Sequence, residues 1–391
     1  MKLSHIMPVF YALTSNADKV SPEPVPVQTR MTQAVAPIAS GTVQNATVID
    51  PDGQFLINAH TNQRQLYSQV AHFSTGDFIV AWEEGDQGET QVMARRFNAD
   101  RIALGNAFQV NTNTTTAARN SPSIAILPDN RFIIIWRHNY RDIMAQFFHS
   151  DGIKDGGERK LGVGSNAIIT ALSDDGFALT YRDTDNAIVI QRHTPNGDVD
   201  RTIKTRPYDR YTAPEVMATP DNGVALSLPR VHQDRVLFFD ATGSQLNHTV
   251  TMPFDSPDHC ASVGEPDTHH NMTTTRMALL KHDNFVLVWT APSCAFQSYN
   301  DVFGRLYHTN GTPHGPEFRV NTYIDGEQMD TEVAALSDGG FVVVWTGRWG
   351  GDLFATIYGQ VYNPDGTMRG PEFQINTNRL LINRNPSVTG M

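Results

Sequence analysis

Arginine and aromatic residues recur in short loops that follow a repeated bulky residue, and they are the residues best suited to hold a ligand. A guanidinium pairs with polar or charged groups, and an aromatic ring stacks on a sugar or on a peptide side chain. Trp349 is the only Trp outside the repeated position; a packing role for it is the alternative interpretation. The candidate ligand-binding residues are Arg137, Tyr140, Arg182, Arg230, Phe296, Tyr299, Arg348 and Trp349.

The acidic segment "EEGDQGE" (83–89) is a candidate cation site. It presents Glu83, Glu84, Asp86 and Glu89 with glycines between them, and oxygen ligands of this kind suit Ca²⁺. The segment lacks the alternating Asp-x-Asp-x-Asp-Gly rhythm of a dedicated calcium loop. A plain acidic loop is therefore the competing interpretation.

Catalytic motifs are missing from the sequence. No Gly-x-Ser-x-Gly elbow, phosphate-cradling glycine loop or His-Glu-x-x-His occurs. Paired carboxylates, such as Glu84 with Asp183 or Asp352, are able in principle to cleave glycosidic bonds, but nothing singles out one pair. We therefore favour a non-enzymatic protein and keep a glycan-active hydrolase or lyase as the alternative.

A repeated phrase shows what positions these residues. "PEFRVNT" (316–322) returns as "PEFQINT" (371–377), with earlier variants in "AFQVNT" (107–112) and "QFLINAHT" (54–61). Each belongs to a longer unit marked by a pair of bulky residues four positions apart, and a long regular period of this kind indicates an array of structural units. The six pairs are Phe78 and Trp82, Phe132 and Trp136, Phe177 and Tyr181, Val224 and Leu228, Phe285 and Trp289, and Phe341 and Trp345.

Each unit contains four short β-rich runs separated by turn residues. Asp-Gly-Gly at 338–340 splits the first two runs, and Asn-Pro-Asp-Gly at 363–366 splits the last two. The second run, such as "FVVVW" (341–345), is apolar at every position, which predicts a strand buried on both faces. Four antiparallel strands per unit, with inner strands buried and outer strands half exposed, is typical of a β-propeller blade.

The two ends of the chain predict closure of the ring. "NPSVTGM" (385–391) restarts the unit, and "NATVIDPDGQFLINAHT" (45–61) matches its last two strands. One composite blade built from both ends, added to six full units, predicts an all-β, seven-bladed β-propeller. We expect a flexible N-terminal arm at 1–30, with weak features of a secretion signal, and a single propeller domain at 31–391.

Two cysteines lie in neighbouring loops of one predicted blade. Cys260 is in the loop that enters the fifth unit, and Cys294 is in the loop after its Trp. This topology makes a disulfide between them geometrically plausible, and a disulfide would indicate an oxidising compartment. Two unrelated thiols are the alternative.

Composition limits the partners. The chain of 391 residues has a formal net charge of −11, and Lys and Arg form no run longer than a pair. Nucleic acid is therefore an unexpected partner, and no apolar run is long enough for insertion into a membrane.

The motifs "SDGGFVVVW", "IYGQVYNPDG" and "PEFQINT" resemble a repeat of bacterial extracellular proteins, often large calcium-binding or adhesin-like chains that contain propeller domains. The resemblance spans roughly residues 45–391 and is strongest in the last two units. It implies secretion and a role in binding or assembly. We therefore expect an extracellular or cell-surface binding and adhesion module that recognises a glycan or a protein surface through loops on one propeller face, with a structural scaffold as a further alternative.

Overall fold

The structure is a computed structural model in which every regular element is a β-strand, within the residues that it describes. These are residues 55, 57, 64–86, 89–112, 119–207, 214–228, 235–251, 275–292, 300–324, 326–348, 355–376 and 386–390. No helix in these ranges is long and apolar enough to cross a membrane. The predictions for residues 1–30 and for the domain boundary at residue 31 lie outside these ranges and stay predictions.

The strands form six antiparallel sheets, each made of four strands that are consecutive in the chain. Blade 1 contains β1 (Gln65–His72), β2 (Phe78–Asp86), β3 (Glu89–Phe97) and β4 (Phe108–Gln109). Blade 2 contains β5 (Arg119–Ile126), β6 (Phe132–His138), β7 (Asp142–Phe148) and β8 (Arg159–Val163). Blade 3 contains β9 (Ser165–Ala171), β10 (Phe177–Arg182), β11 (Ala187–His193) and β12 (Val199–Pro207).

The second half of the chain repeats this order. Blade 4 contains β13 (Glu215–Ala218), β14 (Val224–Leu228), β15 (Arg235–Phe239) and β16 (Gln245–Thr251). Blade 5 contains β17 (Thr275–Leu279), β18 (Asn284–Pro292), β19 (Asn300–His308) and β20 (Phe318–Arg319). Blade 6 contains β21 (Glu327–Ala335), β22 (Phe341–Arg348), β23 (Ala355–Tyr362) and β24 (Phe373–Gln374).

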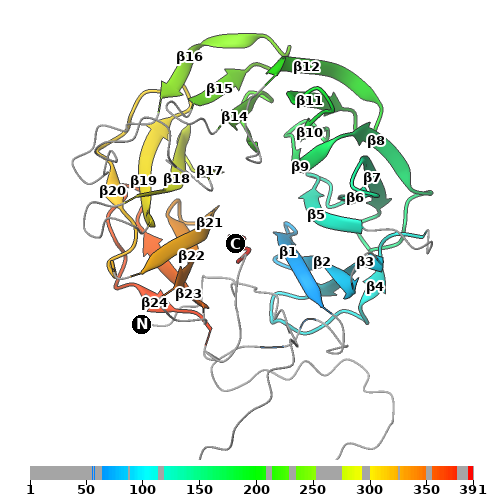
Figure 1. Cartoon of the computed structure of the whole chain (residues 1–391), viewed down its shortest axis with the longest axis horizontal. Helices are drawn as coiled ribbons and strands as arrows, with labels where there is room; N and C mark the ends of the chain where they lie inside the picture. The colour runs from blue at the N-terminus through cyan, green and yellow to red at the C-terminus, as the bar shows by residue number, and fades with distance from the viewer. Residues whose placement is uncertain are drawn as a thin grey trace, which may run out of the picture.

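The six sheets are arranged around a common centre, with their first strands innermost (Figure 1). Consecutive first strands contact one another from β1 through to β21. This arrangement is a β-propeller of four-stranded antiparallel blades, as the repeats predict.

The predicted number of seven blades is wrong, because the described residues form six. The segments expected to build a seventh contribute only Phe55, Ile57 and residues 386–390, too little for four paired strands. These short pieces still cover the flanks of the first and last blades. Phe55 and Ile57 pack against blade 1, and Val388 packs against blade 6.

The C-terminal residues 386–390 lie close to the first strands of blades 1 and 6. The Ser387 hydroxyl accepts a hydrogen bond from the Val70 N–H at 3.1 Å. A Cβ atom on Gly390 would lie 1.5 Å from the Ala335 carbonyl oxygen, so only glycine fits this close approach to β21. Residues 386–390 accordingly lie between β1 and β21, on the inner side of the blades (Figure 1).

The core consists of apolar layers between adjacent blades. The middle residues of the second strands, such as Ile133 to Ile135 in β6, are completely buried. Successive side chains of a strand point to opposite faces, so each second strand supplies two layers. Ile133 and Ile135 pack toward blade 3, whereas Ile134 packs toward blade 1. Every blade therefore needs an apolar neighbour on each side.

The repeated phrase connects blade 5 to blade 6. The buried side chain of Asn321 accepts a hydrogen bond from the Val302 N–H at 2.8 Å, and its amide donates to Asp301 Oδ1 at 2.7 Å and to the Tyr323 carbonyl at 2.9 Å. The N–H and hydroxyl of Thr322 then donate to Glu372 of blade 6, at 2.7 and 2.9 Å. Glu372 belongs to the next copy of the phrase.

The same two contacts recur elsewhere in the ring. Asn111 and Asn376 each accept a hydrogen bond from the strand beside them, at 2.9 and 2.7 Å. Thr112 of blade 1 donates from its hydroxyl to Glu158 of blade 2 at 2.7 Å. The repeat is therefore a structural connector between blades.

Replacing Asn321 with alanine should lower the free energy of unfolding by about 2–4 kcal/mol, because it leaves the Val302 N–H and the Asp301 carboxylate without their buried partner. Chemical denaturation measures the loss. Asn310→Ala is the control: its side chain accepts hydrogen bonds only from the exposed Thr312 in a turn, among the described residues, so the loss should be less than about 1 kcal/mol. Equal losses would contradict the connector role.

Candidate functional site

The upper face of the propeller is defined here as the end at which the second strands run past their bulky anchors. Arg137 lies just before the end of β6, Tyr140 in the turn between β6 and β7, Arg182 at the end of β10 and Arg348 at the end of β22. These residues belong to three blades, and of the four only Arg137 and Tyr140 are brought together. The other predicted site residues, Arg230, Phe296, Tyr299 and Trp349, lie outside the described residues, as do Cys260 and Cys294.

Tyr140 is held in an uncommon backbone conformation on this face. The Arg141 N–H donates to the His138 carbonyl at 3.1 Å, which closes a two-residue turn with Asn139 and Tyr140 at φ values of 51° and 57°. Such turns favour glycine or asparagine, and the left-handed conformation costs other residues about 1–2 kcal/mol. The Tyr140 side chain is nevertheless large and 63% exposed. The fold thus keeps an aromatic ring in solvent where glycine would be unstrained.

Arg137 lies against this ring and has donors to spare. Its Nε donates to Asn120 Oδ1 at 3.0 Å, and its guanidinium carbon is 5.5 Å from the centre of the Tyr140 ring. In the part of the chain that the structure describes, neither terminal nitrogen of Arg137 has a hydrogen-bond partner. The guanidinium is therefore oriented by Asn120 and Tyr140 while its outer edge is free.

Glu83 is the buried carboxyl next to this pair. It is only 7% exposed, and one of its carboxyl oxygens has no hydrogen-bond partner among the described residues. Burial raises the pKa of Glu83 to about 7, although the hydrogen bonds from the Ser121 N–H and Thr90 and the charges of Arg64 and Arg137 all act in the opposite direction. Glu83 is therefore about half protonated at neutral pH.

A β-bulge delivers the N–H that reaches Glu83. The pairing of β5 with β6 shifts between Asn120 and Ser123, and Ser121 in the bulge has a φ of 55°. A bulge inserts an extra residue and redirects the backbone groups near it. The first strands of blades 1, 3 and 6 carry the same irregularity, with Tyr67, Asn166 and Asp330 at positive φ. The bulge is thus a recurring feature of the inner strands at the upper face.

The predicted calcium ligands do not all point to one place. Glu83 and Glu84 are adjacent in β2, so their side chains project to opposite faces of the sheet. Glu83 faces blade 2, whereas Glu84 accepts a hydrogen bond from Gln65 of its own blade at 3.4 Å. Within the described ranges no three His, Cys, Asp or Glu residues are grouped so as to hold a metal ion. The side chain of Asp86 and residues 87–88 lie outside those ranges, so the calcium site stays a prediction.

A second polar cluster, the inner-strand triad, was missed from the sequence. It consists of Glu215 on β13, Arg276 on β17 and Glu332 on β21, the first strands of three consecutive blades. Arg276 Nε donates to Glu332 Oε1 at 2.8 Å, and a terminal nitrogen of Arg276 lies 3.7 Å from Glu215. The three side chains are 15–25% exposed. Aligning the first runs of units four to six would have placed them at one level of the ring.

Burial raises the pKa of Glu215 to about 8; the positive charge of Arg276 opposes the increase, and the negative charge of Glu332 adds to it. Glu215 is accordingly mostly protonated at neutral pH. Arg276 donates a hydrogen bond to Glu332 on one side and lies 3.7 Å from the carboxyl group of Glu215 on the other. The triad joins blades 4, 5 and 6 and places a carboxylic acid and a carboxylate next to one arginine.

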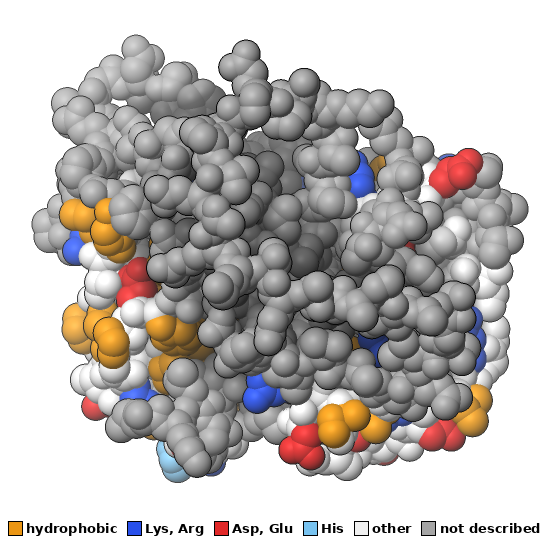
Figure 2. All heavy atoms as spheres, turned by 90° about the horizontal axis from the view of Figure 1, so that it is seen from below, with side chains coloured by type: hydrophobic (Ala, Val, Ile, Leu, Met, Phe, Trp, Pro, Cys, Tyr) orange, Lys and Arg blue, Asp and Glu red, His pale blue; other side chains and the backbone are white. Residues whose placement is uncertain are grey.

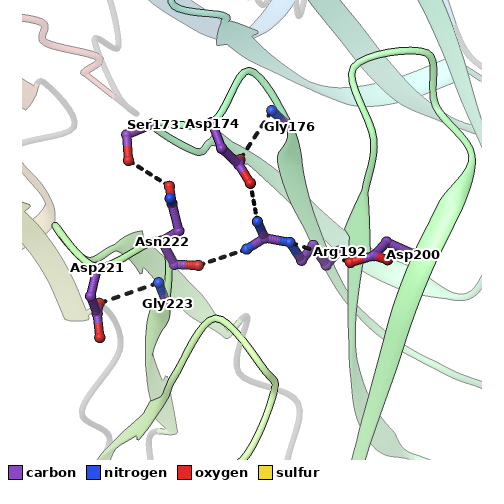
Figure 3. Close-up of polar contacts among 8 residues, drawn as sticks. All are labelled: Ser173, Asp174, Gly176, Arg192, Asp200, Asp221, Asn222 and Gly223. Atoms are coloured by element: carbon purple, nitrogen blue, oxygen red, sulfur yellow. Dashed lines mark hydrogen bonds and ion pairs between the residues drawn. The ribbon is translucent and has the colours of Figure 1, made fainter.

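On the lower face, Arg192 joins blades 3 and 4 and has no free nitrogen. One terminal nitrogen donates to the Asn222 carbonyl at 2.7 Å, the other pairs with Asp174, and Nε lies 3.5 Å from Asp200 (Figure 3). Ser173 reaches across the same blade boundary to Asn222 at 2.5 Å (Figure 3). A shallow recess beside Arg192 has a mainly apolar lining that includes Leu172 and Ile203. Arg192 is therefore a clamp whose donors are used by the fold.

The side of the molecule next to the first and last blades carries no single kind of side chain. Figure 2 shows Lys and Arg, Asp and Glu, and hydrophobic side chains interspersed over its described part. This view gives no concentrated charge on which to place a partner. The upper face, with Arg137 and Tyr140, remains the better candidate site.

Comparison with known proteins finds only distant structural similarity. No family model and no curated protein sequence matches the chain. Among solved structures, AofleA from Arthrobotrys oligospora is 7% identical, with a TM-score of 0.49 and coverage of 83% of this chain and 90% of that chain. A SapL1 lectin in complex with alpha methyl fucoside is 9% identical, with a TM-score of 0.46 and coverage of 79% and 96%.

A third similar structure is the β-propeller domain of the Trilobed protease from Pyrococcus furiosus. It is 8% identical, with a TM-score of 0.43 and coverage of 81% of this chain and 99% of that chain. Identities this low say nothing about a ligand or a reaction. The specific repeat family that the motifs resemble has no match, so function is argued from the site alone.

Glu83→Gln should change the pH dependence of stability. The folded pKa of about 7 exceeds the unfolded value near 4.5, so the stabilising contribution of Glu83 is complete below pH 4.5 and is lost as pH rises through 7. Wild type should therefore lose up to about 3 kcal/mol relative to Glu83→Gln between pH 4.5 and 8.5, as measured by urea denaturation at both values. Parallel pH profiles of the two proteins would contradict this assignment.

Proposed function

We propose that this protein is an extracellular, non-enzymatic binding module that holds a glycan on the upper face, with Tyr140 as the stacking ring. The observation that supports the proposal is the strained and exposed Tyr140 beside the oriented Arg137. Exposed strain of this kind persists in proteins where a site requires it. A tyrosine ring offers an apolar face for a sugar ring, and the free guanidinium donors suit sugar oxygens.

A rigid scaffold supports this assignment. Arg137 and Tyr140 lie at the end of β6, whose preceding residues are completely buried between blades 1 and 3. Binding residues are commonly placed on loops that a rigid core holds in position. The bacterial extracellular repeat that the sequence resembles would place such a module outside the cell, and a protein surface is the competing ligand.

Tyr140→Gly separates the binding role from the folding role. Glycine adopts the observed backbone conformation without strain, so stability should stay equal or rise by about 1 kcal/mol. Affinity for glycans found by array screening should fall about tenfold or more, because the stacking surface is removed. Calorimetric titration and thermal unfolding measure the two effects.

Tyr67→Gly is the matched control. Tyr67 is also an exposed tyrosine at positive φ, but it lies in the bulge of β1 rather than beside Arg137. Its replacement should leave affinity within about twofold. Unchanged glycan binding in Tyr140→Gly would contradict the proposed site, and a complete lack of glycan binding by the wild-type chain would favour a protein ligand or a scaffold role.

A glycan-active enzyme is the second candidate function, and the inner-strand triad is the observation in its favour. Glycoside cleavage uses a protonated carboxyl group and a carboxylate, and Glu215 and Glu332 fit that description. The carboxylates suggested from the sequence fit less well. Glu84 is buried against Gln65, Asp183 is paired with Lys204 at 2.7 Å on another blade, and Asp352 lies outside the described residues.

Glu215→Gln tests the enzymatic alternative. If the triad is catalytic, this variant should lose at least about a hundredfold of any glycosidase activity detected by reducing-end release, because glutamine has no proton to donate to the leaving group. Glu317→Gln, a carboxyl on the outer part of blade 5, is the control and should keep the activity. Activity that survives Glu215→Gln would rule out the triad as its source.

A further inference from the structure

Arg137 differs from Arg192 and Arg276 in the partners of its guanidinium group, because its two terminal nitrogens have none among the described residues. Arg192 uses all three nitrogens within the fold, and Arg276 is held between two carboxyl groups. Arg137 uses Nε alone, on the neutral amide of Asn120. No carboxylate among the described residues lies within 4 Å of a nitrogen of Arg137; the buried Glu83 interacts with its charge from a greater distance and leaves both terminal nitrogens without a contact.

The free edge of Arg137 has a definite chemical preference. Its two terminal nitrogens form a planar fork that matches the two oxygens of a carboxylate. Anchoring of Nε by Asn120 and contact with the Tyr140 ring fix the plane of the fork before a ligand arrives. A preorganised donor pair loses less side-chain entropy on binding than a free arginine does.

The Tyr140 ring limits the class of ligand that can supply the carboxylate. Tyr140 is 63% exposed and lies beside the guanidinium, so one ligand can touch both groups. A uronic acid has an apolar ring face for the tyrosine and a carboxylate at the edge of the ring for the arginine. An acidic peptide side chain has the carboxylate and no flat apolar ring.

We propose that the upper-face site selects glycans that carry a carboxylate, of the uronic acid class, with Arg137 binding the carboxylate in a bidentate manner and Tyr140 stacking on the sugar ring. This inference rests on the proposed glycan-binding function and names its ligand class. The chain as a whole carries a net charge of −11 and repels anions at long range. The preference for a carboxylate must therefore come from direct contact with Arg137.

The test compares oligogalacturonate with its fully methyl-esterified form, which keeps the sugar rings and removes the negative charge. Wild type should bind the acid at least tenfold more tightly than the ester by calorimetric titration, and added salt should reduce the difference. Arg137→Gln should abolish the preference. Arg137→Lys, which keeps the charge and loses the fork, should retain only a small part of it.

Arg131→Gln serves as the matched control, because Arg131 lies at the opposite end of β6 and pairs with Asp129 there. It should keep the full preference for the acid. Thermal unfolding of each variant shows whether it is folded, and the comparison of acid with ester on wild type tests the inference even if Arg137→Gln does not fold.

Several outcomes would overturn the inference. Equal binding of acid and ester, lost in Tyr140→Gly, would refute it and leave the glycan-binding function standing. A preference for the acid that persists in Arg137→Gln would place the charge recognition elsewhere. Tighter binding of a poly-glutamate peptide than of oligogalacturonate would point to acidic proteins, and no binding of any glycan would remove the proposed function as well.

Discussion

The structure depends on one packing constraint: each blade is apolar on both faces and therefore needs a neighbour on both sides. Residues such as Ile134 and Ile135 in β6 alternate between two interfaces, and all are completely buried. Sheets with this property satisfy each other in a ring, whereas an open stack exposes two apolar surfaces. At the ends of the described ring, Phe55 with Ile57 and Val388 cover the surfaces that blades 1 and 6 would otherwise expose.

Polar contacts set the position of one blade against the next. Apolar packing has little directional preference, so it does not by itself prevent two sheets from sliding. The Thr322 contact to Glu372 and the Ser173 contact to Asn222 cross blade boundaries at the upper and lower parts of the ring. These groups belong to repeated turns and phrases, and equivalent contacts join blade 1 to blade 2 through Thr112 and Ser74. The repeats in the sequence are thus explained by the boundaries between blades.

The sequence predicts the strands of a single blade well and the number of blades in the ring less well. Strand pattern, turn residues and the buried Phe341 and Trp345 follow from period-two alternation and turn chemistry, which are local properties. The number of blades depends on how segments from the two ends meet, and no local pattern fixes that. The seventh blade was predicted from the similarity of the terminal segments to the repeat unit. The described residues 55, 57 and 386–390 make contacts with blades 1 and 6 but form no sheet of their own.

In the candidate site, too, properties set by the local sequence were predictable and properties set by other blades were not. Arginine and tyrosine after the Trp136 anchor were predictable as upper-face residues, since the second strand must end there. The free edge of Arg137 was not predictable, because it depends on which partners Asn120 and the other blades leave to it. Arg276 has the same charge but contacts carboxyl groups of the two neighbouring blades. Identical residue types therefore differ in availability only through the assembled ring, and availability is what separates a binding arginine from a structural one.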